Sequence, residues 1–110
     1  ITQMFFDNKK FFDFVAKCRK EGITVPIIPG LKPIASKKQL NLIPHRFKVD
    51  LPDDLIMEVV RASDAEAVKE IGIEWCINQS KELMKAGIPV LHYYSMGKAE
   101  NIKRIAKEVF

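Results

Sequence analysis

The sequence predicts an α/β fold with a parallel sheet, on three observations. Residues 25–28 are apolar without alternation, which is typical of a strand covered on both faces. Strand-like and helical segments alternate along the 110 residues, which indicates parallel strands joined by crossovers. The pattern Lys-x-Gly-Ile followed by a strand occurs at residues 20–25 and again at residues 85–90, and it is typical of a helix-to-strand junction.

The first strand is expected at residues 2–6 because these are mostly apolar. Asp7 or Asn8 can cap the helix that follows, since both side chains accept hydrogen bonds from exposed backbone N–H groups. We expect this helix to reach about Glu21. Gly22 then stands where a left-handed C-cap is needed.

The second strand is expected at residues 24–28, directly after this junction. Pro29-Gly30 and Pro33 should end the strand and direct the loop that leaves its carboxyl end. In parallel α/β sheets this end of the strand is where ligands bind. The loop is therefore predicted to be a stiff rim beside a ligand site.

Two short helices are expected next. The first spans residues 37–43 after a Ser36 cap and ends at Pro44, and residues 45–51 should be irregular or extended. The second begins at Pro52, which suits a first helical turn. Its apolar face consists of Leu55, Ile56, Val59 and Val60.

A long helix and a last β/α unit complete the pattern. Residues 63–66 have the spacing of a capping box, and Gly87 closes the helix that begins there. Residues 89–93 are expected to form the third strand. Residues 98–110 are expected to form the final helix, with one apolar stripe.

Three strands are too few for a stable parallel sheet, because two edges would stay bare. The sheet could be completed as an open doubly wound sheet or as a (β/α)8 barrel of about 250 residues. Residues 7–10 replace the glycine-rich loop of an open dinucleotide-binding sheet, so we favour the barrel. Residues 1–110 are thus predicted to be part of one TIM barrel domain, and the missing initiator Met suggests an excerpt or a processed protein.

The composition argues against several functional classes. The net charge of +4 is spread over lysine doublets without interleaved aromatic residues, so nucleic-acid binding is not expected. No membrane span and no secretory signal are visible. Cys18 and Cys76 fall in helical patterns, which is typical of reduced thiols in a cytoplasmic protein. The cysteines and histidines lack the spacing of a metal site.

Polar residues at the strands and their carboxyl ends are candidates for ligand binding. Gln3 lies within the first strand, and its amide suits either a heterocycle or a backbone partner. Tyr93 and Tyr94 must face opposite sides of the sheet, and the inward one stacks on a flat ligand or packs in the core. Gln39 and Lys98 begin helices and can reach over the rim, although a solvated Lys98 is the simpler alternative. No nucleophile–base pair is visible.

Three sequence blocks resemble the methylenetetrahydrofolate reductase family over essentially the whole chain. These are Ile-Thr-Gln-Met-Phe-Phe-Asp (1–7), Ile-Ile-Pro-Gly-Leu-Lys-Pro-Ile (27–34) and Gly-Ile-Pro-Val-Leu-His-Tyr-Tyr-Ser-Met (87–96). The resemblance implies strands six, seven and eight of a (β/α)8 barrel. It also implies an oxidoreductase that uses FAD to pass a hydride from NADH or NADPH to 5,10-methylenetetrahydrofolate, giving 5-methyltetrahydrofolate.

The resemblance also implies roles for individual residues. Gln3 matches a glutamine that contacts both folate and nicotinamide, and Gln39 matches a second glutamine that contacts folate. Tyr94 matches a tyrosine at the rim of the last strand. Lys98 stands where some members have a folate-contacting arginine, and it keeps the charge but not the bidentate fork. Ile43 is near a position where some members stack a phenylalanine, a role that isoleucine cannot take.

The resemblance places the family's general acid and most FAD contacts in the first five barrel units, outside these 110 residues. We therefore expect no catalytic residue in this chain, FAD held mainly elsewhere, and an inactive fragment. The whole protein is expected to be a cytoplasmic homo-oligomer. Two alternatives stay open: a pterin- or nucleotide-binding module without a redox role, and a structural or interaction fragment whose bare sheet edges pair.

Overall fold

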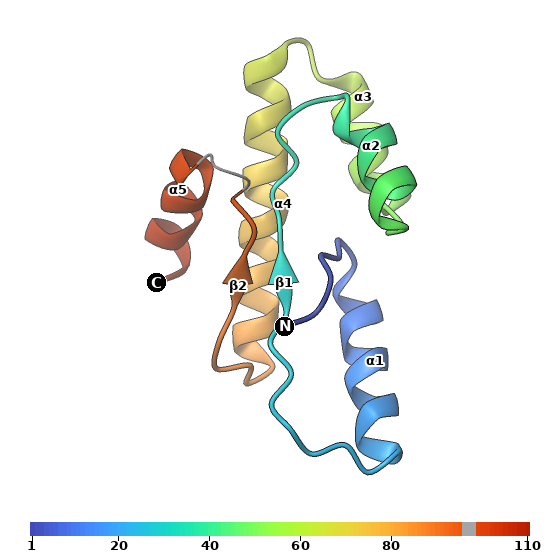
Figure 1. The fold of residues 1–110 in the computed structure, drawn as a ribbon. Helices are drawn as coiled ribbons and strands as arrows, with labels where there is room; N and C mark the ends of the chain where they lie inside the picture. Colours follow the sequence, from blue (N-terminus) through green and yellow to red (C-terminus); the bar gives the residue numbers. More distant parts are fainter. Residues whose placement is uncertain (96–98) are drawn as a thin grey trace.

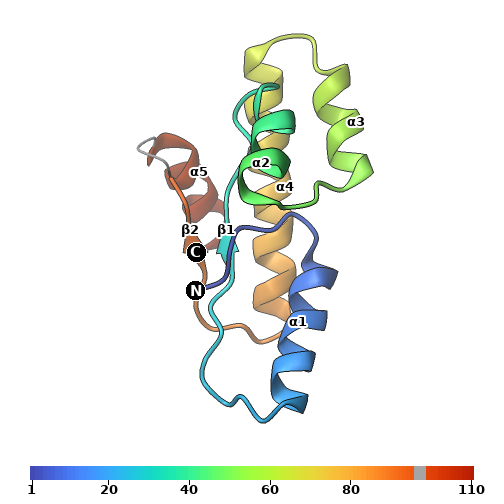
Figure 2. The same ribbon diagram turned by 45° about the vertical axis from the view of Figure 1, so that its right-hand side comes forward.

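The computed structural model describes residues 1–95 and 99–110, and it shows five helices around a small parallel sheet (Figure 1). Helix α4 runs behind the two strands, with α5 on one side and α1 and α3 on the other, as both views show (Figures 1 and 2). The elements are α1 (Asn8–Lys20), β1 (Gly30–Leu31), α2 (Gln39–Phe47), α3 (Asp53–Arg61), α4 (Ala65–Lys85), β2 (His92–Tyr93) and α5 (Ala99–Val109).

The sheet confirms the predicted α/β class and its parallel pairing. Strands β1 and β2 are parallel, with Gly30 opposite His92 and Leu31 opposite Tyr93. On the other side of β1, Met4 forms an isolated parallel bridge with Gly30. Three segments therefore lie side by side in chain order, which is compatible with part of a barrel.

The prediction that residues 24–28 form a buried strand is wrong. The strand begins later, at Gly30, and Val25 is 62% exposed. Pro26 has no N–H group to donate to a neighbouring strand. A side chain on Gly30 would place its Cβ only 2.6 Å from the Thr2 carbonyl oxygen, so glycine is what lets the backbones approach. Gly30, which was expected to end the strand, is instead the first residue of β1.

The ends of two helices also differ from the prediction. Pro44 lies inside α2, which continues to Phe47 and ends at Lys48 with a left-handed φ of 55°. The lost hydrogen bond is offset by packing, because Ile43 is buried and Phe47 packs against the same cluster. Ser36 does not cap this helix, whose N-cap position is Lys38. Helix α4 is capped by Asp64, which accepts from the Ala67 N–H group, instead of by a box from residue 63.

The two helix ends predicted from the internal repeat are confirmed, although the strands begin only at Gly30 and His92 and do not follow them directly. Gly22 and Gly87 have positive φ values of 85° and 91°. The residue after each glycine donates a backbone hydrogen bond into the preceding helix. The Ile23 N–H group donates to the Cys18 carbonyl at 3.0 Å, and the Ile88 N–H group donates to the Leu83 carbonyl at 3.1 Å. This is the Schellman arrangement, so both helix ends have the same geometry. The Asp7 cap of α1 is also confirmed.

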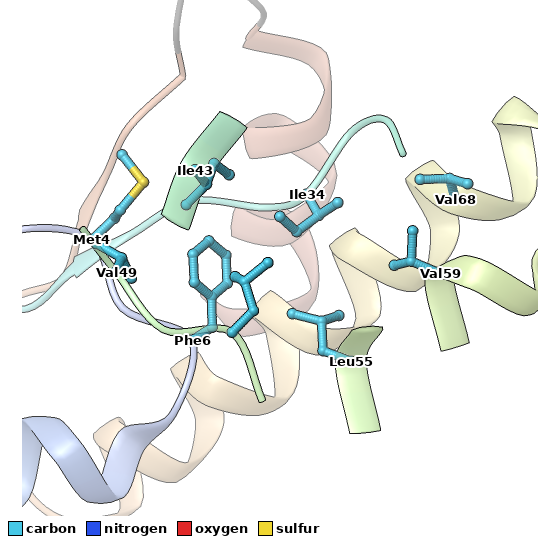
Figure 3. Packing of buried hydrophobic residues seen from close by; sticks show 9 residues of the cluster. Met4, Phe6, Ile34, Ile43, Val49, Leu55, Val59 and Val68 are labelled. Carbon is cyan, nitrogen blue, oxygen red and sulfur yellow. The ribbon is translucent and has the colours of Figure 1, made fainter. Parts of the chain in front are cut away.

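Two apolar clusters stabilise the fold. The first joins the initial segment to α2, α3 and α4, and includes Met4, Phe6, Ile34, Ile43 and Leu55 (Figure 3). The second lies between the sheet and helices α1, α4 and α5, and consists of Phe11, Leu31, Ile73, Cys76, Leu83 and Ile105. No helix in the described parts of the chain is long and apolar enough to cross a membrane.

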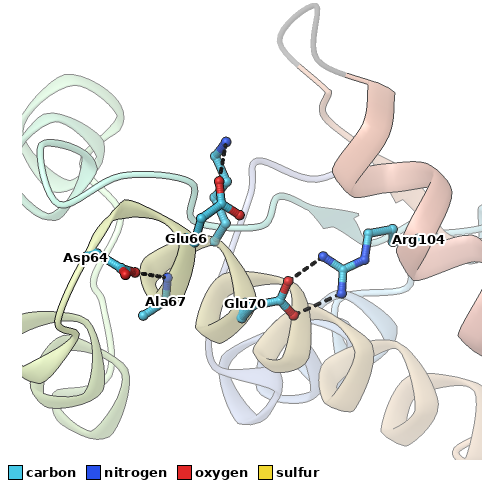
Figure 4. A network of polar contacts seen from close by, with 6 residues as sticks. Asp64, Glu66, Ala67, Glu70 and Arg104 are labelled. Carbon is cyan, nitrogen blue, oxygen red and sulfur yellow. Dashed lines mark hydrogen bonds and ion pairs between the residues drawn. The ribbon is translucent and has the colours of Figure 1, made fainter.

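Helix α5 is tied to α4 by an exposed ion pair. Arg104 donates from Nη1 and Nη2 to the two carboxylate oxygens of Glu70, at 2.5 and 2.9 Å (Figure 4). The hydrogen bond to Arg104 lowers the pKa of Glu70 below its usual value. Both side chains are about half exposed, so the pair orients α5 more than it stabilises the fold.

Candidate functional site

A pocket of about 140 Å³ lies where the chain leaves the carboxyl ends of β1 and β2. Ligands bind at this edge of parallel sheets, because the loops after the strands converge there. Helix α5 contributes the remaining wall. The pocket is lined by Lys32, Pro33, Ala35, Ser36, Gln39, Tyr94, Ser95, Asn101 and Ile102. The structure thus brings together two of the predicted site residues, Gln39 and Tyr94.

The Gln39 side chain folds back onto the loop that precedes its helix. Its Oε1 accepts a hydrogen bond of 2.7 Å from the Ala35 backbone N–H group. A backbone N–H group can only donate, so the amide atom facing it must be the oxygen. The orientation of the Gln39 amide is therefore determined, and the two hydrogens of its Nε2 point away from the Ala35 N–H group. Gln39 stabilises the turn and offers hydrogen-bond donors.

Tyr94 lies across the sheet and not only at its rim. Its phenolic hydroxyl donates to the Thr2 carbonyl oxygen at 2.8 Å. The ring passes over Gly30, where an added Cβ would lie 2.6 Å from ring atom Cε2. The His92 ring packs edge-on against the Tyr94 ring, with the two ring centroids 4.7 Å apart. The hydroxyl is therefore bonded to the backbone, and the ring is the part of Tyr94 that lines the pocket.

Tyr93 faces the other side of the sheet, as strand alternation predicts. Its hydroxyl lies 2.7 Å from Ser80 Oγ on α4. Burial raises the pKa of the Tyr93 phenol, although the bond to Ser80 opposes the shift. Burial also raises the pKa of the nearby Cys76 thiol to about 12. Cys76 is therefore protonated at neutral pH and is no nucleophile.

Gln3 does not share the pocket with Gln39 and Tyr94. The side chain is exposed, and its Oε1 accepts from the Met4 N–H group at 3.0 Å, so it has the backbone partner that the sequence left open as one alternative. Gln3 lies instead on a larger apolar groove of about 690 Å³ beside α1, whose walls include Phe5, Phe14 and Val25. Lys98 falls outside the described residues.

Lys32 is a pocket residue that the sequence prediction missed. Only 6% of its surface is exposed, and its Nζ donates to the Pro33 carbonyl at 3.3 Å. Lysine is seldom buried to this degree. The one signal in the sequence was its position, a charged residue inside the apolar block 27–34.

Comparison with known proteins identifies the family of this chain. A profile of the methylenetetrahydrofolate reductase family matches residues 1–109. The chain belongs to this family. The "Probable methylenetetrahydrofolate reductase (NADPH)" of Caenorhabditis elegans is 35% identical over 112 residues, covering 99% of this chain and 17% of that protein.

Plant and bacterial relatives of the methylenetetrahydrofolate reductase family match similarly. "Methylenetetrahydrofolate reductase (NADH) 1" of Arabidopsis thaliana is 36% identical over 98 residues, 87% of this chain and 16% of that protein. The "5,10-methylenetetrahydrofolate reductase" of Escherichia coli (strain K12) is 33% identical over 101 residues, 91% of this chain and 34% of that protein. The chain thus spans about a sixth of the eukaryotic relatives and a third of the bacterial one.

The two hollows that hold the predicted site residues differ in size and in lining. The pocket with Gln39 is smaller than the roughly 300 Å³ at which pockets for small molecules begin. The larger groove is mainly apolar, and its charged lining residues are Asp7, Lys10, Lys48 and Asp50, of which Lys10 pairs with Asp50 at 3.0 Å. No group of three or more His, Cys, Asp or Glu in the described ranges could hold a metal ion.

Proposed function

We propose that this chain is part of an oxidoreductase that reduces 5,10-methylenetetrahydrofolate to 5-methyltetrahydrofolate with NADH or NADPH. The observation that carries the proposal is the meeting of Gln39 and Tyr94 in one pocket, beyond the carboxyl ends of parallel strands, in a chain of this family. The names of the relatives include both NADPH and NADH, which supports a nicotinamide donor without choosing one.

We propose that Gln39, Tyr94, Lys98 and Gln3 contact the substrate. Gln39 presents amide hydrogens and therefore suits a carbonyl or carboxylate oxygen of folate. Tyr94 offers the face or edge of its ring, because its hydroxyl is bonded to Thr2. Gln3 would contact folate and nicotinamide in turn. The Oε1 atom of Gln3 accepts a hydrogen bond from the Met4 N–H group, so the exposed Gln3 amide, like that of Gln39, offers its Nε2 hydrogens to a ligand.

We further propose that residues 1–110 are strands six to eight of a single (β/α)8 barrel, with their helices. The bare side of the initial segment supports this, since Met4 has its bridge on one side and an apolar groove flanks residues 1–6. FAD would supply the redox group and would be bound mainly by the other units. In the whole protein we expect a cytoplasmic homo-oligomer; both thiols are free, in keeping with such a location.

The test is an assay of the protein as its gene encodes it. We expect formation of 5-methyltetrahydrofolate with NADH or NADPH, and a loss of at least about tenfold in kcat/KM for Gln39→Ala, equal to one strong hydrogen bond. Lys20→Ala, at the far end of α1, is the matched control. Binding of a pterin or nucleotide without any reduction would favour the non-redox alternative.

The isolated 110-residue chain offers a second test. We expect it to be colourless after purification and inactive toward folate, because most cofactor contacts lie elsewhere. A yellow visible spectrum, with stoichiometric flavin, would contradict this proposal. Size measurement in the same preparation addresses the structural alternative, since pairing of bare sheet edges would produce oligomers.

A further inference from the structure

We infer that Thr2 is a positioning residue for the proposed reduction of folate, because its hydroxyl group fixes the backbone of Gln3. The inference rests on the proposed function, in which the Gln3 amide contacts folate and nicotinamide in turn. Thr2 itself need touch neither ligand, since it acts through its neighbour. Neither the sequence pattern nor the names of the relatives assign a role to Thr2.

The first support is a hydrogen bond that departs from the regular pattern of a parallel sheet. The Thr2 N–H group donates to the Ile28 carbonyl at 2.9 Å. Evenly spaced pairing would then direct the N–H group of Gly30 to the Thr2 carbonyl. The Gly30 N–H group donates instead to the Thr2 side chain, to Oγ1 at 3.0 Å. The hydroxyl group therefore takes the place of a backbone acceptor in the sheet.

The second support is the hydrogen bond that the same hydroxyl group donates. Thr2 Oγ1 donates to the carbonyl oxygen of Gln3 at 2.9 Å. A hydroxyl group can accept one bond while it donates another, so the bonds run in one direction from Gly30 through Thr2 to Gln3. Bonds joined in this way polarise and strengthen each other. The position of the Gln3 carbonyl therefore depends on strand β1 through the Thr2 side chain.

The third support is that Gln3 is held at both ends although its side chain is exposed. Its carbonyl oxygen accepts from Thr2, and its side-chain Oε1 accepts from the Met4 N–H group at 3.0 Å. Met4 is in turn bridged to Gly30 of β1. An exposed glutamine held in this way has less rotamer freedom to lose when a ligand binds. The Nε2 hydrogens of Gln3 are therefore oriented before the ligand arrives.

The carbonyl and the hydroxyl group of Thr2 have separate roles. The carbonyl accepts from the Tyr94 hydroxyl at 2.8 Å, whereas the hydroxyl group joins Gly30 to Gln3. Without the hydroxyl group, the Gly30 N–H group would compete with Tyr94 for the Thr2 carbonyl. This carbonyl belongs to the peptide that joins Thr2 to Gln3, so its rotation would turn Gln3 as well. Tyr94→Phe leaves the hydroxyl group of Thr2 in place and is therefore the matched control.

The experiment uses the whole protein as its gene encodes it. Thr2→Val replaces the hydroxyl group by a methyl group of similar size, and Thr2→Ser keeps the hydroxyl group. Gln3→Ala and the double variant complete a double-mutant cycle. Calorimetry measures the Kd of 5-methyltetrahydrofolate, and steady-state kinetics measures KM and kcat with NADH. Thermal unfolding reports the stability of every variant, and Thr2→Ala takes the place of Thr2→Val if the latter does not fold.

We expect Thr2→Val to raise the Kd of 5-methyltetrahydrofolate and the KM for NADH by about five- to tenfold, because Gln3 serves both ligands. Thr2→Ser should stay within about twofold of wild type. In the Gln3→Ala background, Thr2→Val should cause no further loss of affinity, since the residue through which it acts is gone. Tyr94→Phe should lower the unfolding temperature without changing either affinity. A loss for only one ligand would still support the inference and would assign Gln3 to that ligand.

Changes smaller than about twofold in Thr2→Val, or losses that add to those of Gln3→Ala, would overturn the inference. Unchanged binding in Gln3→Ala would also overturn it, because Thr2 would then have no ligand-binding residue to position. In each of these cases, wild type that reduces folate leaves the proposed function standing. Wild type whose binding of 5-methyltetrahydrofolate depends on Thr2 and Gln3, but which reduces no folate, leaves the inference and removes the function. Wild type that neither binds nor reduces folate removes both.

Discussion

The hydroxyl of Tyr94 donates to the carbonyl oxygen of Thr2 at 2.8 Å, and so ties the segment after β2 to the first residues of the chain. The bond passes over Gly30 of the intervening strand. Met4 and His92 flank Gly30 on its two sides. The pocket residue Tyr94 is therefore also a structural link across all three segments.

Removing this hydroxyl should affect stability more than binding. Tyr94→Phe loses one hydrogen bond and leaves the Thr2 carbonyl without its partner, so we expect a loss of about 1 kcal/mol in the free energy of unfolding. The ring remains in the pocket. KM for folate should therefore change little, whereas Tyr94→Ala should raise it. Urea unfolding and steady-state kinetics measure the two effects, and a large KM change in Tyr94→Phe would show that the hydroxyl contacts substrate.

Replacing Gly72 or Gly30 by alanine should destabilise the fold to different extents. An added Cβ at Gly72 would lie 1.8 Å from the Ile34 carbonyl oxygen, and at Gly30 it would lie 2.6 Å from the Thr2 carbonyl oxygen. Gly72→Ala therefore forces helix α4 away from the backbone of the rim. We expect a loss of about 3 kcal/mol or more there, against about 1–3 kcal/mol for Gly30→Ala. Denaturant midpoints should rank the two variants in this order, and the reverse order would contradict the packing described.

The two thiols should react at very different rates. Cys18 is partly exposed, whereas Cys76 is buried with a pKa raised to about 12. A disulfide reagent at pH 8 should modify one thiol per folded chain and two in denaturant, because only a thiolate reacts. Cys18→Ser should abolish the reaction of the folded protein. Rapid modification of both thiols without denaturant would show that the second apolar cluster opens readily.

The same burial predicts a loss of stability at high pH. In the folded chain burial raises the pKa of Cys76 from its usual 9.0 to about 12, so the folded state keeps this proton to higher pH than the unfolded state does. The associated stability is complete below pH 9 and is lost as the pH rises toward 12, by up to about 1.4 kcal/mol per pH unit. Unfolding measured from pH 8 to 11 should show a smaller slope for Cys76→Ala than for wild type.

A network of side-chain hydrogen bonds around Asn8 joins α1 to α4. Asn8 donates from Nδ2 to the Gln79 carbonyl and to Glu82 Oε1, both at 3.0 Å, and accepts from Gln79 Nε2 at 3.1 Å. We expect Asn8→Ala to destabilise the protein by about 2–4 kcal/mol, because several buried groups lose their partners. Lys9→Ala, one residue later and exposed, should cost less than 1 kcal/mol. Equal effects would mean that water replaces the network.

Local chemistry predicted the parts of the fold that depend on neighbouring residues. The Asp7 cap and the glycine junctions at Gly22 and Gly87 depend only on nearby backbone, and all three are confirmed. The position of β1 depends on how closely Thr2 approaches Gly30, which a run of apolar residues does not encode. Pro44 inside α2 reflects the same limit, because tertiary packing outweighs its local cost.

The candidate site was predictable in part for the same reason. Gln39 and Tyr94 follow strands, and the parallel arrangement alone places them at one edge. Burial of Lys32 was not predictable, since the residues that line the pocket with it include Tyr94, Ser95 and two residues of α5, all distant in sequence. The exposed position of Gln3 likewise depends on which segments lie beside residues 1–6, where Met4 forms only an isolated bridge with Gly30.

The bond between Tyr94 and Thr2 joins residues that are 92 positions apart. During synthesis on the ribosome, the segment with Thr2 must wait for the following 92 residues before this partner exists. The helices can form earlier from local contacts, but the order of the three parallel segments is settled only when the last of them arrives. Translation speed up to the unit of β2 and α5 therefore bears on how long the apolar segment of residues 1–6 stays open to wrong partners.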